Sequence, residues 1–201
     1  MTASGSDVRR VLITGASRGI GKAIAECYAS HKYDVIAPTR SELDLSSLDA
    51  VQSFVESGMP EIDVLINNAA DSKTGPLERL ALADWQQVLT VNLTAPLLLL
   101  QAAARGMCAR RWGRIVNVSS CYSMVSRASR APYASSKSGI NALTRTAAIE
   151  YASQNVLVNA VCPGFVATDL TRLNNSPEQI AALCSQVPLG RLAAPEEIAR
   201  Y

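Results

Sequence analysis

Four short segments of the chain consist mostly of β-branched and other apolar residues, with little alternation between apolar and polar positions. They cover residues 10–14, 63–67, 114–120 and 156–161. A strand that faces solvent on one side alternates apolar and polar residues, whereas a strand covered on both faces does not. The pattern therefore predicts strands buried on both faces, as in a parallel sheet.

Between these strands, apolar residues recur at the three- and four-residue spacing of helices. The segments with this pattern are residues 23–30, 46–57, 84–110 and 134–153. Strands that alternate with helices are typical of an α/β fold of Rossmann type, a doubly wound parallel sheet. The sequence contains no internal repeat, low-complexity tract or long linker. We therefore expect residues 1–201 to form a single domain, with residues 1–9 as a flexible N-terminus.

The composition excludes several classes of protein. Nineteen basic and seventeen acidic residues leave a net charge of +2, too small for a nucleic acid to be the main partner. Five widely spaced cysteines without a Cys-x-x-Cys pair, and a single histidine, argue against a disulfide framework and a zinc site. The N-terminus lacks the apolar core of a signal peptide, and the longest apolar run is too short to span a bilayer. We expect a cytoplasmic protein with no membrane partner.

The first predicted strand runs into "TGASRGIG", residues 14–21, with glycines at positions 15, 19 and 21. Glycine lets the backbone turn sharply and approach a pyrophosphate, and the N–H groups at the start of the next helix favour negative charge. In such folds, ligands bind beyond the carboxyl ends of the strands. The segment therefore predicts a dinucleotide at this turn.

Six motifs follow one another along the chain, beginning with "TGASRGIG". The other five are "NNAA" (67–70), "VN" (91–92), "VNVSS" (116–120), "YASSK" (133–137) and "PGFVATDL" (163–170). In their order and approximate spacing, from about residue 11 to residue 200, the chain resembles the classical short-chain dehydrogenases/reductases. The stretches "ATDLTR" and "QVPLGRLAAPEEIA" are most similar to the 3-oxoacyl-[acyl-carrier-protein] reductases of fatty acid biosynthesis.

The resemblance implies four catalytic residues: Asn92, Ser120, Tyr133 and Lys137. Tyr133 and Lys137 are four residues apart on a predicted helix and so share a face, where an ammonium group would lower the pKa of the phenol. In the family, the serine holds the substrate carbonyl and the asparagine holds a water in the proton relay to the lysine. Ser119 competes with Ser120, although strand alternation turns it to the opposite side. The alternative for Asn92 is a buried amide satisfied by backbone groups.

A larger set of residues is implied to bind the cofactor. It comprises Gly15, Ser17, Arg18, Gly19, Ile20, Gly21, Arg40, Asp44, Leu45, Asn68, Ala69, Tyr133, Lys137, Pro163, Gly164, Val166 and Thr168. The chain departs from the family at "NNAA", where the usual motif is "NNAG". If that glycine serves a positive φ, Ala70 carries backbone strain.

The residues after the second strand indicate which cofactor is used. A carboxylate there would bind the ribose 2′-hydroxyl of NAD and repel the 2′-phosphate of NADP. Residues 37–41 contain no acid, and Arg18 and Arg40 can pair with a phosphate, which favours NADP(H) over NAD(H). Glu42 opposes this prediction, and the alternative for both arginines is a solvated surface charge.

Two features differ from the family pattern. About twenty residues, including the crossover helix, are missing after Arg40, so we expect the fold to be shortened at its third strand, with a short, irregular sheet edge. The sequence stops at "PEEIARY", which predicts truncation before the last strand of the family and an exposed sheet edge.

These motifs predict an oxidoreductase that uses NADPH to reduce a ketone, with a 3-oxoacyl thioester as the best candidate, to a secondary alcohol. Residues 171–190 resemble the substrate lid. The alternatives are a reductase or dehydrogenase of another small carbonyl, sugar or steroid, and a catalytically silent nucleotide-binding regulator. The spacing of the three glycines argues against a sugar-nucleotide epimerase. By resemblance, helices around residues 92–107 and 134–153 form a homodimer or homotetramer.

Arginines are predicted to mark the entrance of the substrate site. Arg111 and Arg172 match family positions that contact an acidic carrier protein, and Arg110, Arg127 and Arg130 extend the set. We expect these residues to form a basic rim that attracts a carrier-bound substrate, and the alternative is a group of solvated surface charges.

Overall fold

A five-stranded parallel sheet forms the centre of the computed structural model, which describes residues 8–173 and 175–201. The strands lie in the order β2-β1-β3-β4-β5. Their bounds are β1 Arg10–Ile13, β2 Asp34–Ile36, β3 Val64–Asn67, β4 Gly113–Val118 and β5 Val156–Val161. The predicted parallel α/β architecture is confirmed. Residues 1–7 of the N-terminus expected to be flexible lie outside the described residues.

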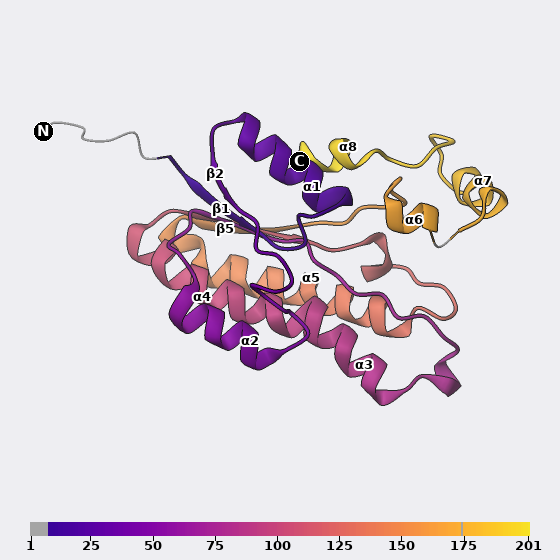
Figure 1. The fold of residues 1–201 in the computed structure, drawn as a ribbon, viewed down its shortest axis with the longest axis horizontal. Coiled ribbons are helices and arrows are strands. Elements are labelled where there is room, and N and C mark those ends of the chain that lie inside the picture. The colour runs from indigo at the N-terminus through magenta and orange to yellow at the C-terminus, as the bar shows by residue number, and fades with distance from the viewer. Residues whose placement is uncertain (1–7, 174) are drawn as a thin grey trace, which may run out of the picture.

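Helices cover both faces of the sheet, with α1 and α8 on one face and α2, α3, α4 and α5 on the other (Figure 1). The α-helices are α1 Gly19–Ser30, α2 Leu48–Ser53, α3 Leu82–Leu89, α4 Ala95–Arg110, α5 Ala131–Tyr151, α6 Asp169–Leu173, α7 Pro177–Ser185 and α8 Pro195–Ala199. Two π-helical turns, η1 Phe54–Gly58 and η3 Thr90–Thr94, and three 3₁₀ turns, η2 Leu77–Arg79, η4 Cys121–Ser123 and η5 Ala152–Gln154, complete the set.

The alternation of side chains along each strand divides the core into two layers. Leu12, Leu65 and Ile115 are fully buried on the side of α4. Val11 and Ile66, their neighbours in sequence, pack on the side of α1. The central strands β1, β3 and β4 therefore bury apolar side chains on both faces, which explains the lack of polar alternation in their sequences. For the edge strand β5 the prediction of burial on both faces is wrong, because Val156 and Val158 are buried whereas Leu157 is 44% exposed.

The sheet edge formed by β2 is short. Within the described part of the chain, no strand lies between β2 and β3, so the third strand expected after Arg40 does not form. Too few residues remain there for a crossover helix. Instead, Leu43 and Leu45 are 5% and 9% exposed and enter the core cluster on the α4 side. The loop between β2 and α2 thus carries the chain from one face of the sheet to the other.

The helical stretch Leu82–Arg110 is long and apolar enough to cross a membrane by length and composition alone. Half of its most apolar window is buried inside the fold, where Leu99, Leu100 and Met107 of α4 pack in the core. A core helix of a globular domain meets the same criteria. The predicted helix over residues 84–110 is interrupted by the π-helical turn η3.

The loop after β2 generates a prediction about stability. We expect Leu43→Ala to lower the free energy of unfolding by about 2–5 kcal/mol, because it leaves a cavity in the core. Leu48→Ala, at a position that is 41% exposed, is the control and should change stability by about 0.5 kcal/mol or less. Urea unfolding of both variants measures the change in stability. If the two substitutions lower the free energy of unfolding by the same small amount, Leu43 does not contribute to the core as proposed.

Candidate active site

Loops at the carboxyl ends of β1 and β3 are joined by side chains from two motifs. The Thr14 hydroxyl oxygen accepts hydrogen bonds from the backbone N–H groups of Asn68 and Ala69, at 3.0 and 3.1 Å. The Asn68 side-chain amide donates to the carbonyl groups of Thr14 and Gly15, at 2.9 and 3.1 Å. These bonds fix the glycine turn against the "NNAA" segment.

The glycine turn needs its glycines for conformation and for space. Gly15 and Gly19 have φ angles of 68° and 55°, in the left-handed region. A Cβ atom on Gly15 would lie 2.8 Å from the Cα of Ala69, and one on Gly21 would lie 2.2 Å from the carbonyl oxygen of Gly15. A Cβ on Gly19 would lie 3.2 Å from the Cγ2 of Thr168, so the segment after β5 also packs against this turn.

The helix start after the glycine turn has the features of an anion-binding site. Helix α1 follows Arg18, and within the described structure no side chain caps its N-terminus and no acidic residue occupies its first turn. The free N–H groups of this helix start can therefore bind a pyrophosphate. At the end of β5, Gly164 is exposed and a Cβ there would meet nothing within 4 Å, which leaves open space where the nicotinamide is expected.

The remaining cofactor residues line the same end of the sheet to different degrees. Ser17 and Arg18 are exposed, whereas Ile20 packs on the core cluster beside α1. Pro163 and Val166 are buried after β5. The structure therefore gathers the predicted glycine-turn and β5 residues at one end of the sheet.

The loop after β2 holds an arginine and two carboxylates. Arg40 lies 3.5 Å from the Asp44 carboxylate, which also accepts hydrogen bonds from the backbone N–H and hydroxyl of Ser46 at 3.0 and 2.7 Å. The Glu42 carboxylate accepts hydrogen bonds from the backbone N–H and hydroxyl of Thr39, at 2.7 and 2.8 Å. These two bonds lower the pKa of Glu42. The Leu45 side chain points into the core, so only its backbone remains for a ligand.

Tyr133 and Lys137 lie on one face of α5, as their spacing predicts. The Lys137 ammonium nitrogen is 5.6 Å from the centroid of the Tyr133 ring. Lys137 is 3% exposed and donates a hydrogen bond of 2.6 Å to the carbonyl oxygen of Val118, at the end of β4. The lysine is therefore held between the sheet and the tyrosine.

The environment of these two residues changes their pKa values. Burial raises the pKa of Tyr133, and the Ser120 side chain lowers it in part, because its hydroxyl can donate to the phenolate oxygen. Burial lowers the pKa of Lys137 to about 8. The expected lowering of the Tyr133 pKa by Lys137 is not found, because burial has the largest effect on Tyr133 and its net result is upward.

The two serines at the end of β4 face different neighbours. The Ser120 side chain lies beside the Tyr133 phenol and lowers its pKa in part, and the Ser120 hydroxyl accepts a bond of 3.2 Å from the backbone N–H of Tyr122. The Ser119 hydroxyl donates instead to the carbonyl of Lys137 on α5, at 3.3 Å. Strand alternation separates the two, and Ser120 is the one beside the tyrosine.

Asn92 is buried in the π-helical turn η3. Its amide oxygen accepts a hydrogen bond of 2.8 Å from the backbone N–H of Asp71, and its amide nitrogen donates to the Asp71 carbonyl at 2.9 Å and to the Ser136 hydroxyl at 3.0 Å. The Ser136 hydroxyl in turn donates to the carbonyl of Tyr133 at 2.8 Å. Both amide hydrogens are thus used to tie the loop after β3 to α5, which matches the alternative of a satisfied buried amide.

Comparison with known proteins extends this picture. Residues 41–179 match the family model described as short chain dehydrogenase. The 3-oxoacyl-[acyl-carrier-protein] reductase FabG of Vibrio cholerae is 38% identical over 209 residues, covering 94% of this chain and 85% of that protein, and its Escherichia coli K12 counterpart is 34% identical with the same coverage. The chain belongs to the short-chain dehydrogenase family. It is therefore an oxidoreductase by family.

Solved structures of this short-chain dehydrogenase family have the same fold. One is a putative NAD(P) dependent gluconate 5-dehydrogenase from Beutenbergia cavernae with bound NADP at low occupancy, with a TM-score of 0.88, 34% identity and coverage of 95% of this chain and 86% of that one. Another is a putative betaketoacyl-ACP reductase, with a TM-score of 0.85, 31% identity and coverage of 96% and 89%. The alignment of 209 residues with the Vibrio protein exceeds the 201 residues of this chain, so that relative has segments that this dehydrogenase lacks.

The predicted rim of Arg111 and Arg172 is wrong for this short-chain dehydrogenase. Arg111 ends α4 two residues before β4 begins, and its guanidinium donates a hydrogen bond of 2.9 Å to the carbonyl of Ser153. This is the amino end of the strand, whereas Ser120 follows its carboxyl end. Arg172 lies on α6, beyond the carboxyl end of β5. Nine residues of separation in the sequence span the full length of the strand and place Arg111 at the opposite edge of the sheet.

The other predicted rim arginines lie partly at the amino ends and partly at the carboxyl ends of the strands. Arg110 forms ion pairs with Glu61 and Asp63 at the amino edge, next to Arg111. On the site side, Arg130 donates a hydrogen bond of 3.0 Å to the Ser72 hydroxyl, and Arg127 lies near the ring of Tyr122. Of the five predicted rim arginines, Arg127, Arg130 and Arg172 therefore lie beyond the carboxyl ends of the strands, and Arg110 and Arg111 do not.

The departure at Ala70 carries no strain. Among residues 8–173 and 175–201, the non-glycine residues with positive φ are Lys32, Arg111, Ser129 and Asn155. Ala70 is not one of them, so alanine fits the turn after β3 as well as the family glycine does.

Three side chains near Tyr133 are absent from the sequence prediction: Tyr122, Ser136 and Phe165. The Tyr122 ring lies 6.3 Å from the Tyr133 ring and 6.4 Å from the Phe165 ring, measured between centroids. Ser136 immediately precedes Lys137, and Tyr122 follows Ser120 by two residues, so proximity to the motifs is the only sequence signal for them.

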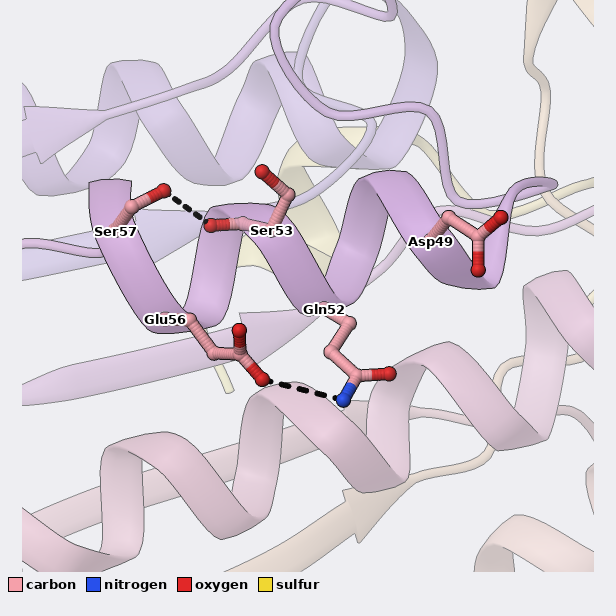
Figure 2. Close-up of a pocket in the computed structure, with 5 residues that line it drawn as sticks. All are labelled: Asp49, Gln52, Ser53, Glu56 and Ser57. Carbon is pink, nitrogen blue, oxygen red and sulfur yellow. Dashed lines mark hydrogen bonds between the residues drawn. The ribbon is translucent and has the colours of Figure 1, made fainter.

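Two hollows lie on the surface of the described structure outside the space beside Tyr133. The hollow in Figure 2 is lined by side chains of α2 and η1, which bond among themselves: Gln52 donates to Glu56 at 3.2 Å, and Ser57 donates to the carbonyl of Ser53 at 2.6 Å. A second hollow lies between α5 and β5, beside Asn141 and Cys162. Within residues 8–173 and 175–201, no group of His, Cys, Asp or Glu side chains is arranged to hold a metal.

The lowered pKa of Lys137 predicts how stability depends on pH. Between about pH 8 and pH 10.5, the unfolded chain binds more protons at this lysine than the folded chain, so the lysine's unfavourable contribution is relieved as pH rises. From pH 7.5 to 9.5, the stability of the wild type should rise relative to Lys137→Met by about 2 kcal/mol. Urea unfolding at the two pH values measures this difference. Lys22→Met removes an exposed lysine and should show no such change, and a flat difference for Lys137→Met would contradict the assignment.

Proposed function

We propose that this dehydrogenase is a single catalytic domain that uses NADPH to reduce a ketone, with a 3-oxoacyl thioester as the best candidate, to a secondary alcohol. The observation that carries the proposal is the meeting of Ser120, Tyr133 and Lys137 at the same end of the sheet as a glycine turn whose helix start can bind a pyrophosphate. A nucleotide sensor would need the turn, but it has no need of a buried phenol beside a serine.

The catalytic residues have distinct tasks in this proposal. When bound, the reduced nicotinamide supplies the hydride. The hydroxyl groups of Ser120 and Tyr133 hold the carbonyl oxygen of the substrate, and Tyr133 gives its proton to that oxygen as an alkoxide develops. The raised pKa keeps the phenol protonated until this step. The Ser120 hydroxyl and the Lys137 ammonium then stabilise the phenolate that remains.

Asn92 is a positioning residue in this scheme. Its bonds to Asp71 and Ser136 hold α5 so that Tyr133 and Lys137 keep their distance from the end of β4. Because both hydrogens of its amide are engaged, a relay water near Lys137 would be bound by another group, such as a backbone carbonyl of the π-helical turn.

NADP(H) is the preferred cofactor in the proposal. Arg18 and Arg40 are exposed at the expected position of the ribose, and the Glu42 carboxylate is already bonded to Thr39, which makes it less available for a ribose hydroxyl. The bound NADP named for the Beutenbergia structure supports the same choice. The pairing of Arg40 with Asp44 weakens its effect and makes the preference moderate in size.

Residues 171–190 serve as the substrate lid in the proposal. The residues on either side of this segment are held together by a parallel β-bridge between Val166 and Ala193. The backbone N–H of Ala167 also donates to the Ala193 carbonyl at 2.8 Å. Helix α7 within it begins with a capping box formed by Ser176 and Gln179. A segment whose two ends are fixed, and whose middle makes few contacts with the rest of the fold, can close over a ligand.

A sugar-acid dehydrogenase is the second candidate, because two solved structures similar to this chain are described as putative gluconate dehydrogenases. Reduction assays with a 3-oxoacyl thioester, a simple ketone and a keto-sugar acid separate the two.

A carrier protein that holds the thioester substrate is supported by the relatives' names alone, since Arg111 and Arg172 do not form one rim. A cytoplasmic homodimer or homotetramer completes the proposal, with α4 and α5 as the contact helices.

Tyr133→Phe tests the proton donor. We expect kcat for ketone reduction to fall by about 10²–10⁴-fold, because general acid catalysis is removed, while the Kd for NADPH stays within a few-fold. NADPH absorbance measures the rate, and fluorescence titration measures binding. Tyr151→Phe, on the same helix, is the matched control. Retention of more than about a tenth of kcat in Tyr133→Phe would exclude its role as the acid.

Arg40→Asp tests the cofactor preference. The substitution removes a cation and adds an anion near the expected 2′-phosphate, so the ratio of kcat/KM for NADPH to that for NADH should fall by about tenfold or more. Arg105→Asp, on the exposed side of α4, controls for net charge. An unchanged ratio in Arg40→Asp would refute the predicted phosphate contact.

A further inference from the structure

Tyr122 is held next to the proposed proton donor. It lies in the short turn η4, two residues after Ser120, and its backbone N–H donates to the Ser120 hydroxyl at 3.2 Å. Its ring packs edge-on against Tyr133, at 6.3 Å and 85°, and against Phe165, at 6.4 Å and 77°. Tyr122 therefore connects the serine, the tyrosine and the segment after β5.

The hydroxyl oxygen of Tyr122 is buried and has no hydrogen-bond partner among the described residues. A buried hydroxyl without a partner is unfavourable. The edge-on ring contacts do not require the hydroxyl, because phenylalanine would make them equally well. The fold of the described chain therefore gives no reason for a tyrosine at this position, and a ligand that brings a hydrogen-bond acceptor does.

Tyr122 lies at the boundary between the buried residues of the site and an exposed loop. Tyr122 as a whole is partly buried. Two residues that follow it closely, Met124 and Val125, are 73% and 61% exposed. The Arg127 guanidinium lies 5.9 Å from the ring centroid, and a cation over the ring makes the phenol a stronger donor. The phenol oxygen lies on the axis of the ring, so a change in the χ1 angle of Tyr122, and not a ring flip, would turn the hydroxyl toward a ligand bound at Tyr133.

We propose that the Tyr122 hydroxyl donates a hydrogen bond to a second carbonyl oxygen of the substrate, and so selects 3-oxoacyl thioesters over simple ketones. This inference rests on the proposed function. In a 3-oxoacyl thioester, one methylene carbon separates the reacting ketone from the thioester carbonyl, so the two oxygens lie close together. With the ketone held by Ser120 and Tyr133, the thioester oxygen reaches the neighbouring phenol. A ketone without a second carbonyl leaves Tyr122 unpaired.

Tyr122→Phe tests the inference with two substrates of similar size: the N-acetylcysteamine thioester of 3-oxobutyrate, and a ketone without a second carbonyl. Loss of one hydrogen bond should lower kcat/KM for the thioester by about two- to tenfold and leave the ketone within about twofold. Tyr28→Phe, a partly buried tyrosine on α1, is the control and should change neither. Urea unfolding should find Tyr122→Phe as stable as the wild type or more so, because an unpaired hydroxyl is removed.

The outcomes separate this inference from the proposed function. Equal losses for both substrates, no loss for either, or a destabilised Tyr122→Phe would overturn the role of Tyr122 while leaving the reductase in place. The proposed function is judged on the wild type alone. If the wild type reduces no 3-oxoacyl thioester, both proposals fail, whatever the variant does.

Discussion

The position of α5 against the carboxyl end of β4 is the constraint on which the site depends. Two of the three proposed catalytic residues lie on this helix, and the third, Ser120, follows the strand. The bond from the Lys137 ammonium to the Val118 carbonyl crosses directly between them, and the Ser119 hydroxyl adds a second bond to the backbone of α5. A small shift of the helix would separate the phenol from the serine, and reactions of this kind tolerate little misplacement.

Buried amide and hydroxyl groups on β3, β4 and α5 also hold α5 against the sheet. The Asn67 side chain donates to Asn117 at 2.9 Å, Asn117 donates to Thr144 at 2.8 Å, and Thr144 donates to the carbonyl of Ile140 at 2.7 Å. This chain of bonds runs from β3 through β4 to α5. A buried polar chain of this kind specifies one register between helix and sheet, because any slip would leave its members unpaired.

The fold and the motif residues could be predicted from the sequence, since apolar runs identify buried strands and the motifs follow strand ends. The position of the arginines could not. The distance from Arg111 to Ser120 along the chain does not indicate that a whole strand lies between them, and only the strand bounds place them at opposite edges. Tyr122 was missed for a different reason: its significance depends on an unpaired atom, which a sequence does not display. The pKa of Tyr133 also required the structure, because the degree of burial decides its direction.

If the proposed cofactor binds at the loop after β2, this loop couples ligand binding to the stability of the sheet edge. Its inward side chains, Leu43 and Leu45, complete the core, while its outward side chains, Arg40 and Glu42, lie where the adenosine half of a dinucleotide is expected. A ligand that binds only the folded edge stabilises it by mass action, by about 2.7 kcal/mol at a hundred times its Kd. The concentration of cofactor in the cell would then set the stability of this shortened edge. When the cofactor is depleted, the free energy of unfolding of the edge would fall, and unfolding would begin at β2.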